Sequence, residues 1–413
     1  MVNEWPRRNI RSLGKVVTGK TPSTRNPQNF SGPYPFITIP DLERHVYIRD
    51  TARTISEQGA ALLNSCLLPA NAVMMSCIAT VGKCGITVEP SFTNQQINSV
   101  ICNKNVEPRY LYYCFRQLKF QLEATGGGGS VYTNVSKSRF SELEVPIPPL
   151  SDQRAIASIL GALDDKIELN RQINNTLEAM AQALFKSWFV DFELFSDQGM
   201  QESVLGPIPR EWRCATVSEA IEINPPRKVE QGANAIYVDM ASLPTASARV
   251  LTVIRRAFTG SGSRFRNGDI LLARITPCLE NGKTAIVDFL GDGENGWGST
   301  EFIVLGPKSP LSTPFIYCLA RNPDFRAHAI QAMTGTSGRQ RVDAGCFNYY
   351  WLAVPPKSVA EQFGHKVEPW FQMMKANDDE SHVLATVRDT LLAKLLSGEI
   401  RVKDAEKFVE NAV

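Results

Sequence analysis

The sequence predicts an α+β protein in which two α/β heads with mixed sheets are separated by two long helices, packed as an antiparallel coiled coil, in a tandem pseudo-repeat. Two observations support this fold class. The proline pairs Pro148–Pro149 and Pro355–Pro356 lie 207 positions apart, and each leads into a long segment with few Gly or Pro residues. Trp5 and Trp212 show the same spacing. A repeat at a fixed period indicates that one structural unit occurs twice.

The chain length agrees with more than one domain. A chain of 413 residues exceeds what one hydrophobic core usually supports. The formal net charge of +2 excludes a global basic field, so only local clusters can attract a nucleic acid.

The cysteine content indicates the compartment. Nine cysteines without a C-x-x-C pair are typical of free thiols in a reducing compartment. We expect a cytoplasmic protein, because no signal peptide or long apolar run is evident.

Shorter matches extend the repeat between its anchors. The matched pairs are NAVMMSCIATVGKCGI (71–86) with NGDILLARITPCLENGKTAI (267–286), YLYYCFR (110–116) with FIYCLAR (315–321), and TGGGGSVYTNVSKSRF (125–140) with TGTSGRQRVDAGCF (334–347). The spacing is kept while many side chains differ. We therefore predict four segments, namely head 1 (1–149), a first spacer helix with its linker (150–204), head 2 (205–356), and a second spacer helix with a C-terminal tail (357–413).

The two spacer segments carry a heptad pattern with a polar break. We expect the central polar residues of the two helices to meet when the helices pack antiparallel. Arg388 and Pro369 interrupt the second pattern, so the second helix is expected to kink or to begin after Pro369. Ser151 and Ser358 are the expected N-caps. The predicted seam consists of Ile156, Leu160, Leu163, Ile167, Asn170, Asn174 and Leu177, with Asn377, Leu384 and Leu391 on the other helix.

The chain resembles the specificity (S) subunit of type I restriction–modification systems over essentially its whole length. The resemblance rests on PPLSDQRAIASILGALDDKIELNRQINNTLEAMAQALFKSWFVDF (148–192), and on a looser copy, PPKSVAEQ (355–362) followed by LLAKLLSGEI (391–400). It implies that each head is a target recognition domain that reads one half of a bipartite site in double-stranded DNA. It also implies that the helices set the spacing and dock two methyltransferase (M) subunits, while restriction/translocase (R) subunits join through the assembled complex. The chain itself would be non-catalytic.

Two other functions remain open at this stage. INPPRK (223–228) begins like the N-P-P-aromatic motif of amino-methyltransferases, which suggests a self-contained adenine-N6 DNA methyltransferase with Asn224 in its site. Arg227 stands where that motif needs a stacking ring, so a turn is the favoured interpretation. The other alternative is a protein–protein adaptor that does not bind DNA. No cofactor or metal site is expected, because phosphate-loop, cofactor-loop and ligand-spacing patterns are missing from the sequence.

Candidate DNA-binding residues fall into clusters in both heads. Cations are expected at phosphates, while amides and arginines in loops can read base edges. The candidates in head 1 are Arg11, Lys20, Thr21, Arg25, Lys83, Asn94, Gln95, Gln96, Tyr132 and Asn134, together with the Gly-rich loop 126–130. The candidates in head 2 are Arg255, Arg256, Arg274, Thr276, Asn281, Lys283, Arg339, Gln340 and Arg341, and Arg249, Arg264 and Arg266 extend its basic cluster.

Overall fold

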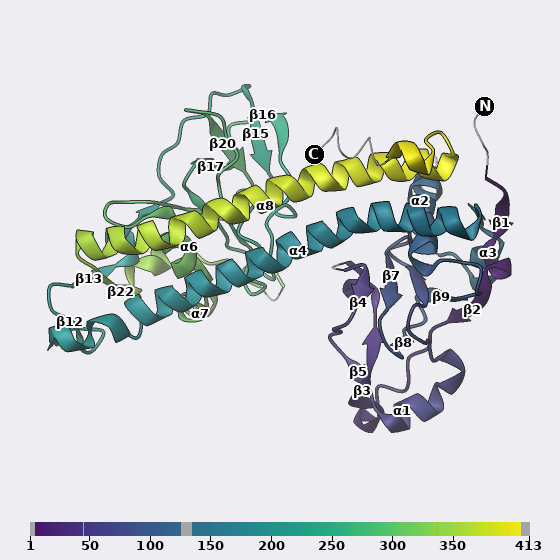
Figure 1. Cartoon of the computed structure of the whole chain (residues 1–413). Coiled ribbons are helices and arrows are strands. Elements are labelled where there is room, and N and C mark those ends of the chain that lie inside the picture. Colours follow the sequence, from purple (N-terminus) through teal and green to yellow (C-terminus); the bar gives the residue numbers. More distant parts are fainter. Residues whose placement is uncertain (1–4, 44, 125–133, 337, 406–413) are drawn as a thin grey trace. The chain divides into compact units, whose positions relative to one another are not determined.

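The chain folds into two compact units in a computed structural model that describes residues 5–43, 45–124, 134–336 and 338–405. Unit 1 comprises Met1–Leu169 and Glu380–Val413, and unit 2 comprises Asn170–Asp379. Two long helices, α4 (Leu150–Phe189) and α8 (Lys357–Ser397), contribute one half to each unit (Figure 1). The units therefore divide the two helices, and the predicted division into four consecutive segments stays a prediction.

Head 1 in unit 1 is built on a five-stranded mixed sheet with the strand order β2-β9-β6-β7-β4. Helix α2 packs against β6 and β7, while a smaller sheet, β5-β3-β8, packs with α1. The elements are β1 (Arg7–Asn9), β2 (Gly14–Thr18), β3 (Phe30–Ile37), β4 (Tyr47–Ile48), β5 (Thr54–Ile55), α1 (Glu57–Leu62), β6 (Val73–Ser76), β7 (Cys84–Thr87), β8 (Phe92–Thr93), β9 (Ile97–Cys102), α2 (Pro108–Ala124), α3 (Lys137–Glu142) and β10 (Glu144–Pro146).

Head 2 in unit 2 repeats this plan. Its main sheet has the order β14-β21-β18-β19, with α6 packed on it, and a second sheet has the order β16-β15-β20-β17. The elements are β11 (Met200–Gln201), β12 (Ile208–Pro209), β13 (Arg213–Thr216), α5 (Val217–Ala220), β14 (Glu222–Ile223), β15 (Asn234–Val238), β16 (Ile254–Ala257), β17 (Ser263–Arg266), β18 (Ile270–Ala273), β19 (Thr284–Ile286), β20 (Asn295–Gly298), β21 (Phe302–Gly306), α6 (Thr313–Arg321), α7 (Pro323–Gln331) and β22 (Trp351–Val354).

The register of the closing strand pair repeats with the same offset as the prolines. In head 1, β1 pairs antiparallel with β10 so that Arg8 lies opposite Val145. Adding 207 to both numbers gives Ala215 and Leu352, which lie opposite each other in the antiparallel pair β13–β22. A one-residue slip would turn every side chain to the other face, so an identical register is a strict match. The predicted fold class, with its tandem pseudo-repeat, is confirmed.

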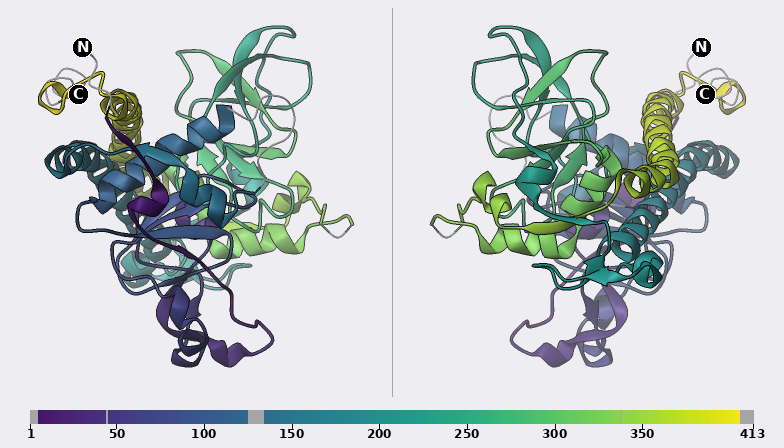
Figure 2. Two further views of the ribbon diagram at one scale, coloured as in Figure 1. Left: turned by 90° about the vertical axis from the view of Figure 1, so that its right-hand side faces the viewer. Right: turned by 90° about the vertical axis from the view of Figure 1, so that its left-hand side faces the viewer.

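The helices α4 and α8 lie side by side and antiparallel within each unit (Figures 1 and 2). In unit 1 the predicted seam residues Ile156, Leu160 and Leu163 share a hydrophobic core with Leu384 and Leu391. Each fully buried side chain of this size contributes roughly 1.5–3 kcal/mol to folding. Amphipathic helices of this kind are stabilised chiefly by such packing.

In unit 2 the same helices meet through a polar layer and an aromatic core. Asn377 Nδ2 donates to Asn174 Oδ1 over 2.8 Å, and Asn170 Nδ2 donates to the carbonyl of Asn377 over 3.3 Å. Asn174 Nδ2 also donates to Asp378 over 2.8 Å. The seam residue Ile167 packs at the edge of the unit 1 core and Leu177 at the edge of the unit 2 core. Amides that meet between two helices in this way fix the register of the pair.

The helix starts differ from the expectation in two ways. The backbone carbonyls of Pro149 and Pro356 accept the first intrahelical hydrogen bonds, so Ser151 and Ser358 lie inside the first turn and are not N-caps. Pro369 lies within α8, so the alternative in which the helix begins after this proline is wrong, while a kink at Pro369 stays a prediction. A proline twelve residues after the helix start is tolerated here because tertiary packing overrides the propensity.

The side chain of Gln153 stabilises the first junction, where Pro148–Pro149 lead into α4. This side chain is 1% exposed and spans the junction between head 1 and α4. Gln153 Oε1 accepts from the amide of Glu107 over 3.0 Å, while Nε2 donates to the carbonyls of Asn105 and Pro148. The position 207 residues later is the buried Ala360, and the glutamine of the second junction, Gln362, is exposed. The two junctions therefore share their backbone plan but not this contact.

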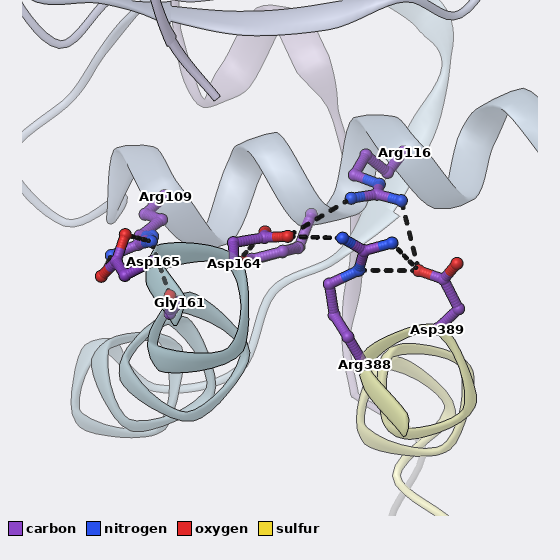
Figure 3. Close-up of polar contacts among 8 residues, drawn as sticks. Arg109, Arg116, Gly161, Asp164, Asp165, Arg388 and Asp389 are labelled. Carbon is purple, nitrogen blue, oxygen red and sulfur yellow. Dashed lines mark hydrogen bonds and ion pairs between the residues drawn. The ribbon is translucent and has the colours of Figure 1, made fainter. Parts of the chain in front are cut away.

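Arg388, expected to disturb the seam, is instead part of a buried ion network in unit 1 (Figure 3). Arg388 Nη1 lies 2.5 Å from Asp164 Oδ1, and both side chains are almost fully buried. Tyr113 of α2 donates its hydroxyl to Asp164 over 2.6 Å, and Arg116 of α2 lies 3.2 Å from Asp389. Burial raises the pKa of Tyr113, and the charge of Asp164 raises it further, so the phenol stays a donor. The network joins α2 to both long helices.

A second ion pair ties α2 to α4 one turn away. Arg109 donates to both oxygens of Asp165, over 2.6 and 3.0 Å, and to the carbonyl of Gly161 over 2.9 Å. A Cβ atom on Gly161 would lie 2.4 Å from Arg109 Cζ, which explains a glycine inside a long helix.

Within the described residues, no helix is both long and apolar enough to cross a membrane.

Candidate nucleic-acid interface

In head 1, three loops that are distant in sequence meet beyond the end of β6. The amide of Cys77 donates to the carbonyl of Gln96 over 2.7 Å, and the carbonyl of Cys77 accepts from the amide of Val135 over 2.7 Å. Ile78 and Asn134 form an isolated antiparallel bridge beside this contact. Two of the predicted candidates, Gln96 and Asn134, are thus brought to one edge of the head.

Head 2 contains the same backbone arrangement beyond the end of β18. The amide of Arg274 donates to the carbonyl of Glu301 over 3.0 Å, and its carbonyl accepts from the amide of Val342 over 2.9 Å. Ile275 and Arg341 form the matching isolated bridge. Arg274 therefore occupies the position of Cys77, Glu301 that of Gln96, and Arg341 that of Asn134.

The turn before the last central strand is closed in the same way in both heads. The amide of Gln96 donates to Asn94 Oδ1 over 3.0 Å, and the amide of Glu301 donates to Ser299 Oγ over 3.1 Å. We call this repeated set the loop frame; it consists of residues 77–78, 94–96 and 134–135 in head 1, and residues 274–275, 299–301 and 341–342 in head 2. The contacts of residues 77 and 274 with the other two loops are main-chain hydrogen bonds that do not depend on side-chain identity, whereas Asn94 and Ser299 close the turn through a side-chain oxygen.

The side chains on the loop frame differ between the heads. In head 2, Arg341 Nε donates to both carboxylate oxygens of Glu301, over 2.8 and 2.9 Å. The hydrogen bond to Glu301 raises the pKa of Arg341, so the guanidinium stays charged. In head 1, Asn94 Nδ2 donates to Gln96 Oε1 over 3.0 Å, and Thr21 donates to Gln95 over 2.7 Å. The loop frame of head 1 therefore carries side-chain amides, whereas that of head 2 carries the guanidinium of Arg341 and the carboxylate of Glu301.

Arg274 lines a cavity of about 310 Å³ in head 2, together with Arg264 and the turn at Asn224. Its Nε is buried and, among the described residues, has no hydrogen-bond partner. Thr276 donates to Glu280 over 3.1 Å, and its amide donates to the carbonyl of Gln340. These residues belong to the same edge as Arg341.

The remaining candidates fall into three groups. Lys20, Arg25, Asn281 and Arg339 are exposed, and Lys83 is half-buried. Four others have contacts within the chain: Arg11 pairs with Glu142, Lys283 donates to the carbonyl of Met240, and the exposed Arg255 and Arg256 contact Glu294 and the rings of Tyr237 and Trp297, respectively. Tyr132 and the Gly-rich loop 126–130 lie outside the described residues.

The basic cluster of head 2 is smaller than the sequence suggested. Arg249 is mostly buried, with Nε 2.9 Å from Asp288 and Nη1 2.7 Å from Asp379 of α8. It therefore anchors head 2 to its helix and is not available to a ligand. Arg255 and Arg256 lie on the exposed strand β16, at the edge of its sheet.

The N-P-P segment forms a structural turn. Asn224 adopts φ = 46°, its amide donates to the carbonyl of Val304, and its Oδ1 accepts from the amide of Val304. Gly19 occupies this position in head 1, where its amide donates to the carbonyl of Ile97 and a Cβ atom would lie 2.2 Å from a carbonyl oxygen. Asparagine adopts a left-handed backbone conformation more readily than most residues, which suits position 224, whereas the nearby carbonyl oxygen explains the glycine at position 19.

Arg227, which follows the two prolines, also has a structural role. It donates to both oxygens of the fully buried Asp269, over 2.9 and 3.1 Å, and to Glu222 over 3.1 Å. The contacts of Asn224 and Arg227 therefore give both residues a role in the folding of this segment.

Within the described parts of the chain, no group of three or more His, Cys, Asp or Glu side chains is placed to hold a metal ion.

Cys77, Ser299 and Glu301 are among the loop-frame positions that sequence reasoning missed. Cys77 is buried and apolar in character, and Glu301 precedes a strand-like run, so neither attracts notice by itself. A residue-by-residue superposition of the two repeats is the one signal that could have found them, because Glu301 lies opposite Gln96 in that alignment.

The comparisons with known proteins agree with this architecture. Residues 3–179 match the family model described as "Type I restriction modification DNA specificity domain". The MjaIX type I restriction enzyme specificity subunit of Methanocaldococcus jannaschii is 28% identical over 97% of this chain and 94% of its own length. The HindI specificity subunit of Haemophilus influenzae is 36% identical over 35% of this chain and 32% of that protein.

A solved structure supports the fold of the whole chain. The type I restriction–modification S subunit from M. genitalium aligns with a TM-score of 0.52 at 16% identity, covering 95% of this chain and 96% of that chain. Fold and loop frames together define a protein with two similar heads, each of which carries one loop frame. Residues 3–179 thus match the DNA specificity domain of type I restriction–modification systems, and the whole chain is similar to a type I restriction specificity subunit.

Proposed function

We propose that the chain is the DNA-sequence-specificity subunit of a type I restriction–modification complex. Head 1 and head 2 each read one half of a bipartite site in double-stranded DNA. The observation that carries this proposal is the loop frame, which keeps one main-chain arrangement in both heads while its side chains change. Sequence is read by hydrogen bonds to base edges, so a fixed frame with variable polar side chains suits two different half-sites.

Phosphate contacts are assigned to exposed cations outside the loop frame. Lys20 and Arg25 supply them in head 1, and Arg255 and Arg256 supply them in head 2. Such contacts position a protein on DNA without reading its sequence. Because the net charge is only +2, we infer that stable DNA binding needs the partner subunits as well.

The helices α4 and α8 set the spacing between the half-sites and dock two methyltransferase subunits. Restriction/translocase subunits join through the assembled complex. Removal of one heptad from both helices is expected to change the number of bases between the half-sites and to leave both half-site sequences unchanged. Mapping of methylated sites in a host that carries the chain and its partners measures both quantities.

The chain acts without a catalytic site of its own. This part of the proposal is supported by Asn224 and Arg227, which are engaged in a turn and an ion pair. Incubation of the purified chain with DNA and a labelled methyl donor tests it, since methyl transfer without an added subunit would contradict it. Salt-dependent DNA binding that appears only when the chain joins its methyltransferase partner would exclude a pure protein–protein adaptor.

A further inference from the structure

Arg341 is held on the loop frame of head 2 by contacts of both its backbone and its side chain. Its backbone pairs with Ile275 on one side and with Thr334 on the other, where the two amide–carbonyl hydrogen bonds are both 2.9 Å long. Its side chain is fixed by Glu301 through Nε, and Nη2 lies 2.7 Å from Glu301 Oε1. Backbone and side chain are thus positioned before any ligand arrives.

The geometry of this pair leaves the recognition edge of the guanidinium open. Arginine has five N–H donors in a planar fork. Glu301 engages Nε and one donor of Nη2, so the outer edge, with one donor on each of Nη1 and Nη2, points away from the carboxylate. The Arg341 side chain is 45% exposed. Two parallel donors in a plane match the O6 and N7 acceptors of guanine.

The equivalent position in head 1 carries a different reader. Asn134 is exposed and forms the bridge to Ile78, just as Arg341 forms the bridge to Ile275. Asparagine offers one donor and one acceptor, which match the N7 and N6 groups of adenine. The two heads therefore present two base-reading chemistries on one backbone position.

We propose that residues 134 and 341 are equivalent base-reading positions, so that Arg341, held by Glu301, selects guanine in the half-site of head 2 and Asn134 selects adenine in the half-site of head 1. This inference rests on the proposed function and assigns its specificity to named side chains. Glu301 is a positioning residue: it orients Arg341 and does not contact the base.

Exchange of the two residues between the heads tests the assignment. The full chain is assembled with its methyltransferase subunits as wild type, Arg341→Asn, Asn134→Arg and Glu301→Gln, and methylated sites are mapped across genomic DNA. Arg341→Asn is expected to replace a guanine requirement at one position of one half-site, with a change in preference of about 10- to 100-fold, and to leave the other half-site unchanged. Asn134→Arg should introduce a guanine preference in the other half-site.

Glu301→Gln separates positioning from reading. It removes the charge that orients Arg341 but keeps an acceptor, so guanine should stay preferred with weaker discrimination. Arg256→Ala is the matched control, because Arg256 is an exposed arginine of the same head outside the loop frame. It should weaken methylation equally at all sites without any change of sequence.

Three results would overturn the assignment. One is a wild-type complex whose two half-sites contain no guanine, a measurement that needs no variant to fold. Another is Arg341→Asn with an unaltered recognition sequence, and the third is a uniform loss over all sequences, which identifies a phosphate contact. If the wild-type complex methylates no bipartite site at all, the proposed function fails, and that outcome is distinct from these three.

Discussion

Asp164 of α4 and Arg388 of α8 form a buried ion pair, with 2.5 Å between Asp164 Oδ1 and Arg388 Nη1. The positions related to them by the repeat offset of 207 are Phe371 and Ala181, both buried in the hydrophobic core of unit 2. At these positions the two helices therefore pack through charged side chains in unit 1 and through apolar side chains in unit 2. Since pairing α4 with a second α4 would set Asp164 against an alanine, this asymmetry favours pairing of α4 with α8.

Arg388→Ala is expected to destabilise unit 1 by about 3 kcal/mol, because it leaves the buried carboxylate of Asp164 without its main partner. Arg116, 3.9 Å from Asp164, compensates in part. Denaturant unfolding of the full chain measures the loss. Lys357→Ala, which removes an exposed ion pair on the same helix, is the control and should cost under about 1 kcal/mol.

The double variant Asp164→Ala, Arg388→Ala decides how the loss arises. If the cost of the single change is an unpaired buried charge, the double variant will be less destabilised than the two single variants taken together. Additive losses would instead mean that the two side chains stabilise unit 1 independently through packing.

This ion pair also marks where sequence reasoning stops. The heptad pattern predicts both helices and their antiparallel pairing, because hydrophobic periodicity is a local signal. The same pattern treats Arg388 as a disturbance, because its partners Asp164 and Arg116 come from other elements. A buried charge can be interpreted only when its neighbours are known, and they lie more than 200 positions away in the case of Asp164.

Gln153→Ala is expected to loosen the junction between head 1 and α4, whereas Gln362→Ala is expected to be neutral. The first change removes a buried side chain with three hydrogen bonds and leaves the amide of Glu107 unsatisfied, at about 1–3 kcal/mol. Gln362 is exposed. Hydrogen exchange at the amide of Glu107 reports the change locally, and equal protection in both variants would contradict it.

Asp378→Asn is expected to stabilise unit 2 at neutral pH. Burial raises the pKa of Asp378 to about 6, even though Arg249 and the hydrogen bond from Asn174 act to lower it. A carboxyl group whose folded pKa exceeds its unfolded value near 3.8 binds its proton more tightly in the folded state. Its contribution to stability is therefore most favourable below pH 4 and is lost as the pH rises through about 6.

The measurement compares unfolding free energies of wild type and Asp378→Asn from pH 4 to pH 8. The asparagine keeps an acceptor for Asn174 but carries no charge at any pH. Its advantage over wild type should grow across the pH 4–6 window by about 1–3 kcal/mol and then level off. A difference that does not vary with pH would show that Asp378 titrates normally.

The loop frame sets the second limit on sequence reasoning. Loops rich in amides and arginines predict candidate readers such as Gln96 and Arg341, because those side chains suit base edges. They do not predict that Gln96 meets Cys77, or that Glu301 holds Arg341, since these contacts depend on how three loops converge. Arg249 shows the opposite error. The sequence places it in a basic cluster that could bind DNA, whereas in the structure it pairs with Asp288 and with Asp379 of α8.

Arg227→Ala is expected to destabilise head 2 by about 3 kcal/mol, because Arg227 is the bidentate partner of Asp269, whose side chain is completely buried. The amide of Arg266 would remain as a donor to Asp269, but an amide does not neutralise the carboxylate. Arg255→Ala is the matched control, since Arg255 is 54% exposed in its ion pair with Glu294 whereas Arg227 is 9% exposed. Denaturant unfolding monitored in both variants gives the comparison.

Arg227→Phe extends this test to the catalytic alternative, because it creates the complete N-P-P-aromatic motif. If the segment were a methyltransferase site that merely lacked its stacking ring, this variant would gain methyl transfer to DNA. We expect a loss of stability similar to that of Arg227→Ala and no transfer from a labelled methyl donor. Asn224 would still hold the backbone of Val304 through its amide and Oδ1, and a group engaged in that turn cannot also bind an extruded adenine.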